Sequence, residues 1–191
     1  MMKKTAFAGI LFCLLTSQAF AHGYITEPAS RAANCRDGKN PAAMCGSAQW
    51  EPQSIETFSG FPDGKFPPDG RLASGGIERF LPLDTPGDNW HQITVKPGTA
   101  MFTWKITAAH KTRNWRYYIT RPDWQPGAPL TRASFEPEPF CSYDDKNQVP
   151  PQTVTHQCTI PERSGYQVIY GVWEIADTAN SFYQVIDVRF D

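Results

Sequence analysis

Proline and glycine interrupt this chain so often that long regular elements are not expected. The sequence holds 17 prolines and 14 glycines, and every proline lies after residue 21. No long stretch shows the 3.6-residue apolar period of an amphipathic helix, whereas several short stretches alternate apolar and polar residues. In residues 100–107, Phe102, Trp104 and Ile106 fall on one face. Such alternation is typical of strands that bury one face.

Comparable alternation or an apolar run recurs in residues 114–120, 166–173 and 181–190. In the last of these, Phe182, Ile186 and Val188 fall on one side, so the pattern makes Phe182 an inward-facing strand residue. Turn signals such as Lys96-Pro97-Gly98 separate the segments. Together they predict an all-β, antiparallel sandwich. Residues 33–80 lack the alternation, and we expect an ordered insertion with short helices, folded over one end of the sandwich.

The first 21 residues have the pattern of a secretory signal. Lys3 and Lys4 precede a short apolar run, and Ala19-Phe20-Ala21 offers small residues at the two positions that a signal peptidase reads. An anchoring helix would need roughly 20 apolar residues, more than this run provides. We therefore expect cleavage after Ala21, secretion to the extracellular medium, and one domain over residues 22–191 with no second domain appended.

Four cysteines remain after that cleavage: Cys35, Cys45, Cys141 and Cys158. An even number in an exported chain predicts two disulfides, and three pairings are possible. We favour Cys35–Cys45 and Cys141–Cys158, because each closes a short local loop that would add roughly 3 kcal/mol of stability. A four-cysteine zinc site is the alternative, but no C-x-x-C spacing occurs.

The charge balance excludes two classes of partner. Without Lys3 and Lys4, 16 basic residues face 19 acidic ones, a net charge of -3. Such a mild negative balance argues against binding to nucleic acid or to anionic membranes.

A chain that begins at His22 carries two metal ligands in one residue. The α-amino nitrogen and the ring Nδ1 can close a chelate on one metal, and a further imidazole would complete three nitrogens in a T shape. A planar set of amine and imidazole nitrogens favours copper. Spacing alone leaves three histidines open as the further ligand: His91, His110 and His156.

A set of motifs spread over residues 22–188 resembles the bacterial chitin-active lytic polysaccharide monooxygenases, formerly described as chitin-binding proteins. The first are His22-Gly23-Tyr24-Ile25, Pro28-Ala29-Ser30-Arg31, Cys45-Gly46-Ser47 and Gln49-Trp50-Glu51-Pro52-Gln53-Ser54. Further along come Phe102-Thr103-Trp104-Lys105 with His110, Trp115-Arg116-Tyr117, Leu130-Thr131-Arg132-Ala133-Ser134-Phe135 and Pro139-Phe140-Cys141. The last are Ala176-Asp177-Thr178-Ala179-Asn180 and residues 182–188.

The resemblance implies an immunoglobulin-like or fibronectin-III-like sandwich, one copper ion per chain, and a flat face for crystalline chitin or cellulose. It places the two copper-binding histidines at His22 and His110. It also gives Phe182 and Ala108 the axial sides of the copper and puts Glu56 near it. The family's substrate face falls on Trp50, Glu51, Pro52, Thr107, Asp177 and Asn180. Trp50 stands where the family often has tyrosine.

The same resemblance implies a monomeric enzyme that takes electrons from an external donor and uses oxygen or peroxide as co-substrate. It would hydroxylate a carbon at the glycosidic linkage, by C1 oxidation, so that the chain breaks. A conventional glycosidase would need two carboxylates about 5–10 Å apart, and no such motif is present. The alternative on this scaffold is a non-catalytic chitin-binding protein or adhesin, which does not need an unblocked His22.

Overall fold

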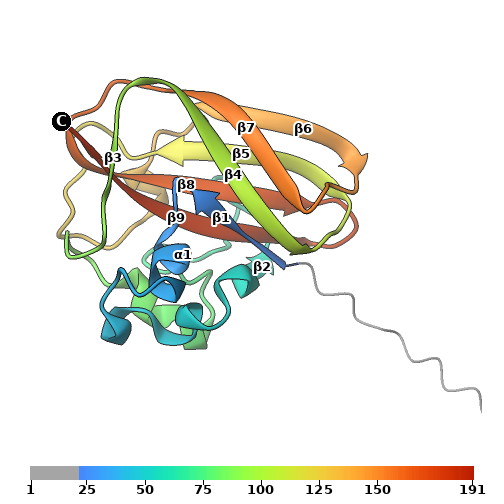
Figure 1. Ribbon diagram of the computed structural model, residues 1–191, viewed down its shortest axis with the longest axis horizontal. Helices are drawn as coiled ribbons and strands as arrows, with labels where there is room; N and C mark the ends of the chain where they lie inside the picture. The colour runs from blue at the N-terminus through green and yellow to red at the C-terminus, as the bar shows by residue number, and fades with distance from the viewer. Residues whose placement is uncertain (1–21) are drawn as a thin grey trace, which may run out of the picture.

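Two sheets packed face to face make up most of the protein, as the computed structural model shows for residues 22–191 (Figure 1). The expected signal over residues 1–21, with Cys13, lies outside the described residues. The smaller sheet has the order β1 (His22–Glu27), β4 (Gly98–Ala108) and β7 (Thr153–Ile160). Its pairings are antiparallel. The expected antiparallel sandwich is confirmed.

The larger sheet has six strands within the described part of the chain. Five of them run in the order β2 (Glu56–Phe58), β9 (Asn180–Phe190), β8 (Gly165–Ile175), β5 (Thr112–Ile119) and β6 (Cys141–Gln148). The short strand β3 (Ile93–Val95) pairs with the end of β9 in the parallel sense. The strands β4, β5, β8 and β9 include nearly all of the four segments that the sequence pattern indicated.

The core between the sheets is rich in aromatic rings. Phe102 and Trp104 of β4 pack against Trp115 and Tyr117 of β5 and against Trp173 of β8. Trp115 and Trp173 stack with ring centroids 4.9 Å apart. The residues that alternate with these on β4, such as Lys105 and Thr107, are exposed, as the period-two pattern predicts.

The insertion covers a face of the sandwich and also reaches one end of it, where its strand β2 pairs with the start of β9. It contains the helix α1 (Arg31–Arg36) and the short 3-10 helices η1 (Ala42–Met44), η2 (Gly46–Gln49), η3 (Pro52–Ser54) and η4 (Glu78–Asp84). In Figure 1 these lie along the outer side of β8 and β9. Their apolar residues form a second core with Tyr170 of β8 and Tyr183 of β9. A further 3-10 helix, η5 (Arg132–Ser134), follows β5.

As a result, β8 and β9 are buried on both faces. A buried ion pair fixes the insertion to this sheet, because Arg31 of α1 donates from Nε and Nη2 to the two carboxylate oxygens of Asp187, at 2.9 and 2.5 Å. Both disulfides, Cys35–Cys45 and Cys141–Cys158, have the expected pairing. No helix in residues 22–191 is long and apolar enough to cross a membrane.

Candidate metal centre

His22 begins β1 and lies opposite Ala108, the last residue of β4, in the antiparallel ladder. The Thr107 hydroxyl donates to the backbone carbonyl of His22 at 3.4 Å. The residue after His22 must be small, because a Cβ on Gly23 would lie 2.8 Å from the Trp173 ring and 2.9 Å from Ile106 Cδ1. The start of β1 is therefore held tightly against the end of β4 and against the aromatic core.

His110 follows the end of β4 by two residues, so it lies at the same end of the sandwich as His22. Its Nδ1 is 3.1 Å from Oδ1 of Asp177 in the turn between β8 and β9. Its backbone carbonyl accepts from the hydroxyl of Thr112 at 3.2 Å, and that hydroxyl accepts from Trp173 Nε1 at 2.7 Å. These contacts fix both the ring and the backbone of His110.

The Asp177 contact determines which ring nitrogen of His110 is available. Slight burial disfavours the charged carboxylate, but hydrogen bonding and charge attraction from His110, helped by backbone N–H groups, hold the pKa of Asp177 below its usual range. An ionised carboxylate can only accept, so Nδ1 of His110 must donate. In the neutral imidazole the lone pair then sits on Nε2, the nitrogen that a metal would take.

The other two histidines lie elsewhere. His156 is buried on β7, where its Nδ1 is 2.7 Å from the Tyr117 hydroxyl. Its ladder partner is Phe102, six residues before Ala108 and so about 20 Å along the strand. His91 is exposed and precedes β3, which pairs with the far end of β9. Only His110, of the three candidates, lies beside His22.

Glu56 and Phe182 complete this end of the sandwich. They are ladder partners on β2 and β9, and Asn180 Nδ2 donates to Glu56 Oε1 at 3.0 Å. The Phe182 ring is fully buried and stacks on Trp173, with centroids 4.8 Å apart. Its inward orientation, expected from the strand pattern, is confirmed. Trp173 thus touches the start of β1 on one side and the Phe182 ring on the other.

The donor set suits copper more than zinc or a hard cation. His22 and His110 could contribute imidazole nitrogens, and the nearby carboxylate of Asp177 is occupied by His110. No group of three or more His, Cys, Asp or Glu side chains within residues 22–191 could hold a metal by itself. A chain that begins at His22 would add its α-amino nitrogen to the two imidazoles. Such a nitrogen set favours copper.

A sequence profile described as "Lytic polysaccharide mono-oxygenase, cellulose-degrading" matches residues 22–188. The chain belongs to the lytic polysaccharide mono-oxygenase family.

Sequence relatives agree with this assignment. GlcNAc-binding protein A of Shewanella oneidensis is 50% identical over 179 residues, which cover 93% of this chain and 37% of the relative. The protein of the same name from Photobacterium profundum is 47% identical, over 99% of this chain and 40% of the relative. The chain thus spans less than half the length of these relatives.

Solved structures of the family superpose closely. An AA10 lytic polysaccharide mono-oxygenase from Photorhabdus luminescens has a TM-score of 0.85 at 44% identity, covering 89% of this chain and 99% of that one. A CBM33 protein of Bacillus amyloliquefaciens, solved in complex with Cu(I), has a TM-score of 0.81 at 40% identity, covering 89% and 100%.

The remaining residues of the expected substrate face differ in exposure. Trp50, directly after η2, is 79% exposed, so its ring lies at the surface. Glu51 pairs with Arg79, with its Oε1 2.7 Å from Nε. Pro52 is buried, and its carbonyl accepts from Gln184 Nε2 at 3.2 Å. Pro52 therefore supports this segment from within, and its contact with substrate stays a prediction.

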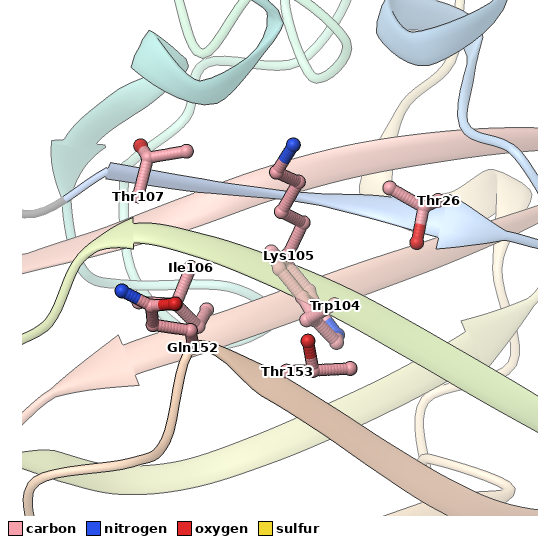
Figure 2. Close-up of a pocket in the computed structure, with 7 residues that line it drawn as sticks. All are labelled: Thr26, Trp104, Lys105, Ile106, Thr107, Gln152 and Thr153. Atoms are coloured by element: carbon pink, nitrogen blue, oxygen red, sulfur yellow. The ribbon is translucent and has the colours of Figure 1, made fainter.

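A cavity beside the start of β1 lacks the residues for hydrolysis. This shallow cavity of about 400 Å³ lies over β1, β4 and β7, between Thr26 and Thr107 (Figure 2). Lys105 is its one charged lining residue among those that the structure describes. Without a pair of carboxylates, this cavity cannot do the acid–base work of a glycosidase.

The sequence analysis missed two exposed aromatic residues beside Asn180 and Glu56, namely Phe58 and Phe66. Phe58 lies two residues after Glu56 on β2, so the two side chains share a face. Three residues are too few to establish such a strand from sequence alone.

Proposed function

We propose that this protein is a secreted, copper-dependent lytic polysaccharide mono-oxygenase that cleaves crystalline chitin by C1 oxidation. The observation that carries the proposal is the pairing of His22 with Ala108 at the strand end that leads to His110, whose Nδ1 is taken by Asp177. The family assignment and the Cu(I) complex of a structural relative support copper as the metal. The names of the GlcNAc-binding relatives support chitin as the substrate.

Cleavage after Ala21 would give His22 a free amino group. The amine and ring Nδ1 of His22, with Nε2 of His110, would hold one copper ion. Bound copper supplies one-electron redox chemistry toward an oxygen or peroxide co-substrate, with electrons from an external donor. Asp177 holds the proton on Nδ1 of His110, and the buried Phe182 ring keeps water from the core side of the site. The small side chain of Ala108 would crowd one side of the metal.

The substrate would lie across the end of the sandwich. Trp50 offers an exposed ring for the C–H face of a sugar, and the polar groups of Thr107, Asn180 and Glu56 suit its hydroxyl and amide edges. An open surface suits a crystal, from which a chain cannot be threaded into a closed pocket. The protein would act as a monomer outside the cell.

Mass spectrometry of products from β-chitin tests the proposal. With copper and a reductant, the protein that begins at His22 should release oligosaccharides heavier by one oxygen atom, with the acid at the reducing end. The His110→Ala variant should release none. Binding to chitin without any oxidised product would support a non-catalytic chitin-binding protein in place of the enzyme.

A further inference from the structure

Two phenylalanine rings lie exposed beside the candidate metal centre. Phe58 is 56% exposed and Phe66 is 40% exposed, and their rings meet edge to face with centroids 5.3 Å apart. Isolated exposed apolar residues are common on protein surfaces, whereas contiguous apolar patches rimmed by polar residues often serve interaction, and these two rings form one continuous apolar surface. We call Phe58 and Phe66 the phenylalanine pair.

The pair continues the surface that Glu56 and Asn180 begin. Side chains two apart on a strand point to the same face, so Phe58 shares the face of Glu56. Phe58 is also the ladder partner of Asn180, whose amide donates to Glu56. Backbone and side-chain bonds at Ser59 fix the strand to the β8–β9 turn, because Ser59 N donates to Ala179 O at 2.8 Å.

The loop that carries Phe66 is held firmly. The guanidinium of Arg132 donates to three backbone carbonyls in it: Pro62 at 2.9 Å, Phe66 at 3.0 Å and Pro67 at 2.7 Å. The loop also folds on itself so closely that a Cβ on Gly64 would lie 2.7 Å from Gly60 Cα. A fixed backbone presents the exposed ring without a large ordering cost on binding.

We infer that the phenylalanine pair is an additional sugar-binding platform, which stacks on a pyranose ring of a β-1,4-linked glycan beyond the units held at the metal centre. Phenylalanine rings offer only an apolar face, and Glu56 and Asn180 supply polar groups at its border. A pyranose has the matching combination of a C–H face and a polar edge. The choice of occupant rests on the proposed function, because the pair adjoins the proposed substrate surface.

The test is the binding of copper-loaded protein to β-chitin and to crystalline cellulose without reductant, so that no turnover occurs. The double variant Phe58→Ala/Phe66→Ala should bind about five- to tenfold more weakly than the unaltered protein, on whichever glycan that protein binds. Phe58→Leu, which keeps apolar bulk but loses the ring, should also weaken binding. Met101→Ala is the matched control, since Met101 is 46% exposed near the other end of β4.

Unchanged affinity of the double variant, or full affinity with leucine at position 58, would overturn the inference. A second result would also overturn it. If sedimentation velocity shows a dimer of the unaltered protein and a monomer of the double variant, the pair binds a second copy of the chain. Copper affinity and the electron paramagnetic spectrum should stay unchanged in all variants. The product assay is independent of this test. If the double variant binds more weakly but the unaltered protein yields no oxidised products, only the enzymatic proposal is refuted.

Discussion

Asp177 accepts from Nδ1 of His110 at 3.1 Å, across the turn that joins β8 to β9. The two residues are distant in sequence, and their contact exists because the β8–β9 turn lies beside the end of β4. The backbone is tied at the same point, where Ala176 N donates to Lys111 O at 2.7 Å. This contact orients the ring that we propose as a metal ligand.

Replacement of Asp177 should weaken copper binding without harming the fold. Loss of a carboxylate that orients a ligating histidine costs about 10- to 100-fold in metal affinity. We expect that range for Asp177→Ala and a smaller loss for Asp177→Asn, whose amide oxygen can still accept. Calorimetric titration with Cu(II) measures the affinity, and thermal denaturation of the metal-free protein should show little change because Asp177 is exposed. Equal copper affinity in all three proteins would contradict the orienting role.

A free amino terminus at His22 should be required for tight copper binding. A protein that keeps Ala21 before His22 has an amide where the chelating amine is proposed. The loss should exceed roughly 100-fold, the upper range for residues that only orient a ligand, because a direct ligand is removed. Tight binding by this extended protein, measured by the same titration, would rule out the proposed nitrogen set.

His110 and His91 should differ sharply in function. His110→Ala should abolish oxidation of chitin while the protein still folds, since the His110 ring lies at the end of the sandwich and outside both cores. His91→Ala should keep most of the activity, because His91 is exposed and far along β9 from Phe182. Product formation and circular dichroism measure the two effects. Reversed phenotypes would mean that the ligand is wrongly placed.

Trp50 should contribute to chitin binding and not to stability. Loss of one stacked aromatic ring costs about 1 kcal/mol, by analogy with aromatic pairs, which is roughly a fivefold loss of affinity. Trp50→Ala should therefore bind crystalline chitin more weakly with an unchanged melting temperature, because its ring is 79% exposed. Weaker binding should also speed self-inactivation by leaving reduced copper without substrate. A large fall in melting temperature would instead show that the ring supports the fold.

Burial of His156 should make the fold less stable in acid. Burial lowers its pKa from 6.5 to about 4, and the charge of Asp145 opposes this only in part. The groups around it are the hydroxyl of Tyr117 on β5 and the ring of Tyr143 on β6, stacked 4.4 Å away. Between pH 6.5 and 4, His156 is protonated in the unfolded chain but stays neutral in the native protein. The free energy of unfolding therefore falls as the pH falls through this window.

The size of this effect follows from the shift in pKa. At pH 4.5 it should cost on the order of 2–3 kcal/mol relative to pH 7. Urea denaturation at the two pH values measures it, and His156→Gln should remove this part of the loss. An equal loss of stability at pH 4.5 in the unaltered protein and in His156→Gln would show that other titratable groups cause it.

The chain of residues 22–191 could be assigned to a fold from local patterns alone. Alternation in residues 100–107 and 181–190 identified β4 and β9, because a strand that buries one face carries that information in its own sequence. Each disulfide closes a short loop, so the pairing of Cys35 with Cys45 and of Cys141 with Cys158 could also be predicted. Strands β1, β6 and β7 were not identified. The short strands β2 and β3 were also missed, since three residues do not establish a period.

What the sequence determined by itself was the family, the strand pattern and the unusual residue His22. Spacing left three histidines open and the family resemblance singled out His110, but only the tertiary structure places His110 beside His22, because that depends on the register between β1 and β4 and on the place of the β8–β9 turn. The structure also decided that the insertion buries the outer face of β8 and β9, and that Trp50 is exposed while Pro52 is buried. Alternation reports which residues share a face of a strand, but not what covers that face, which depends on segments far away in the chain.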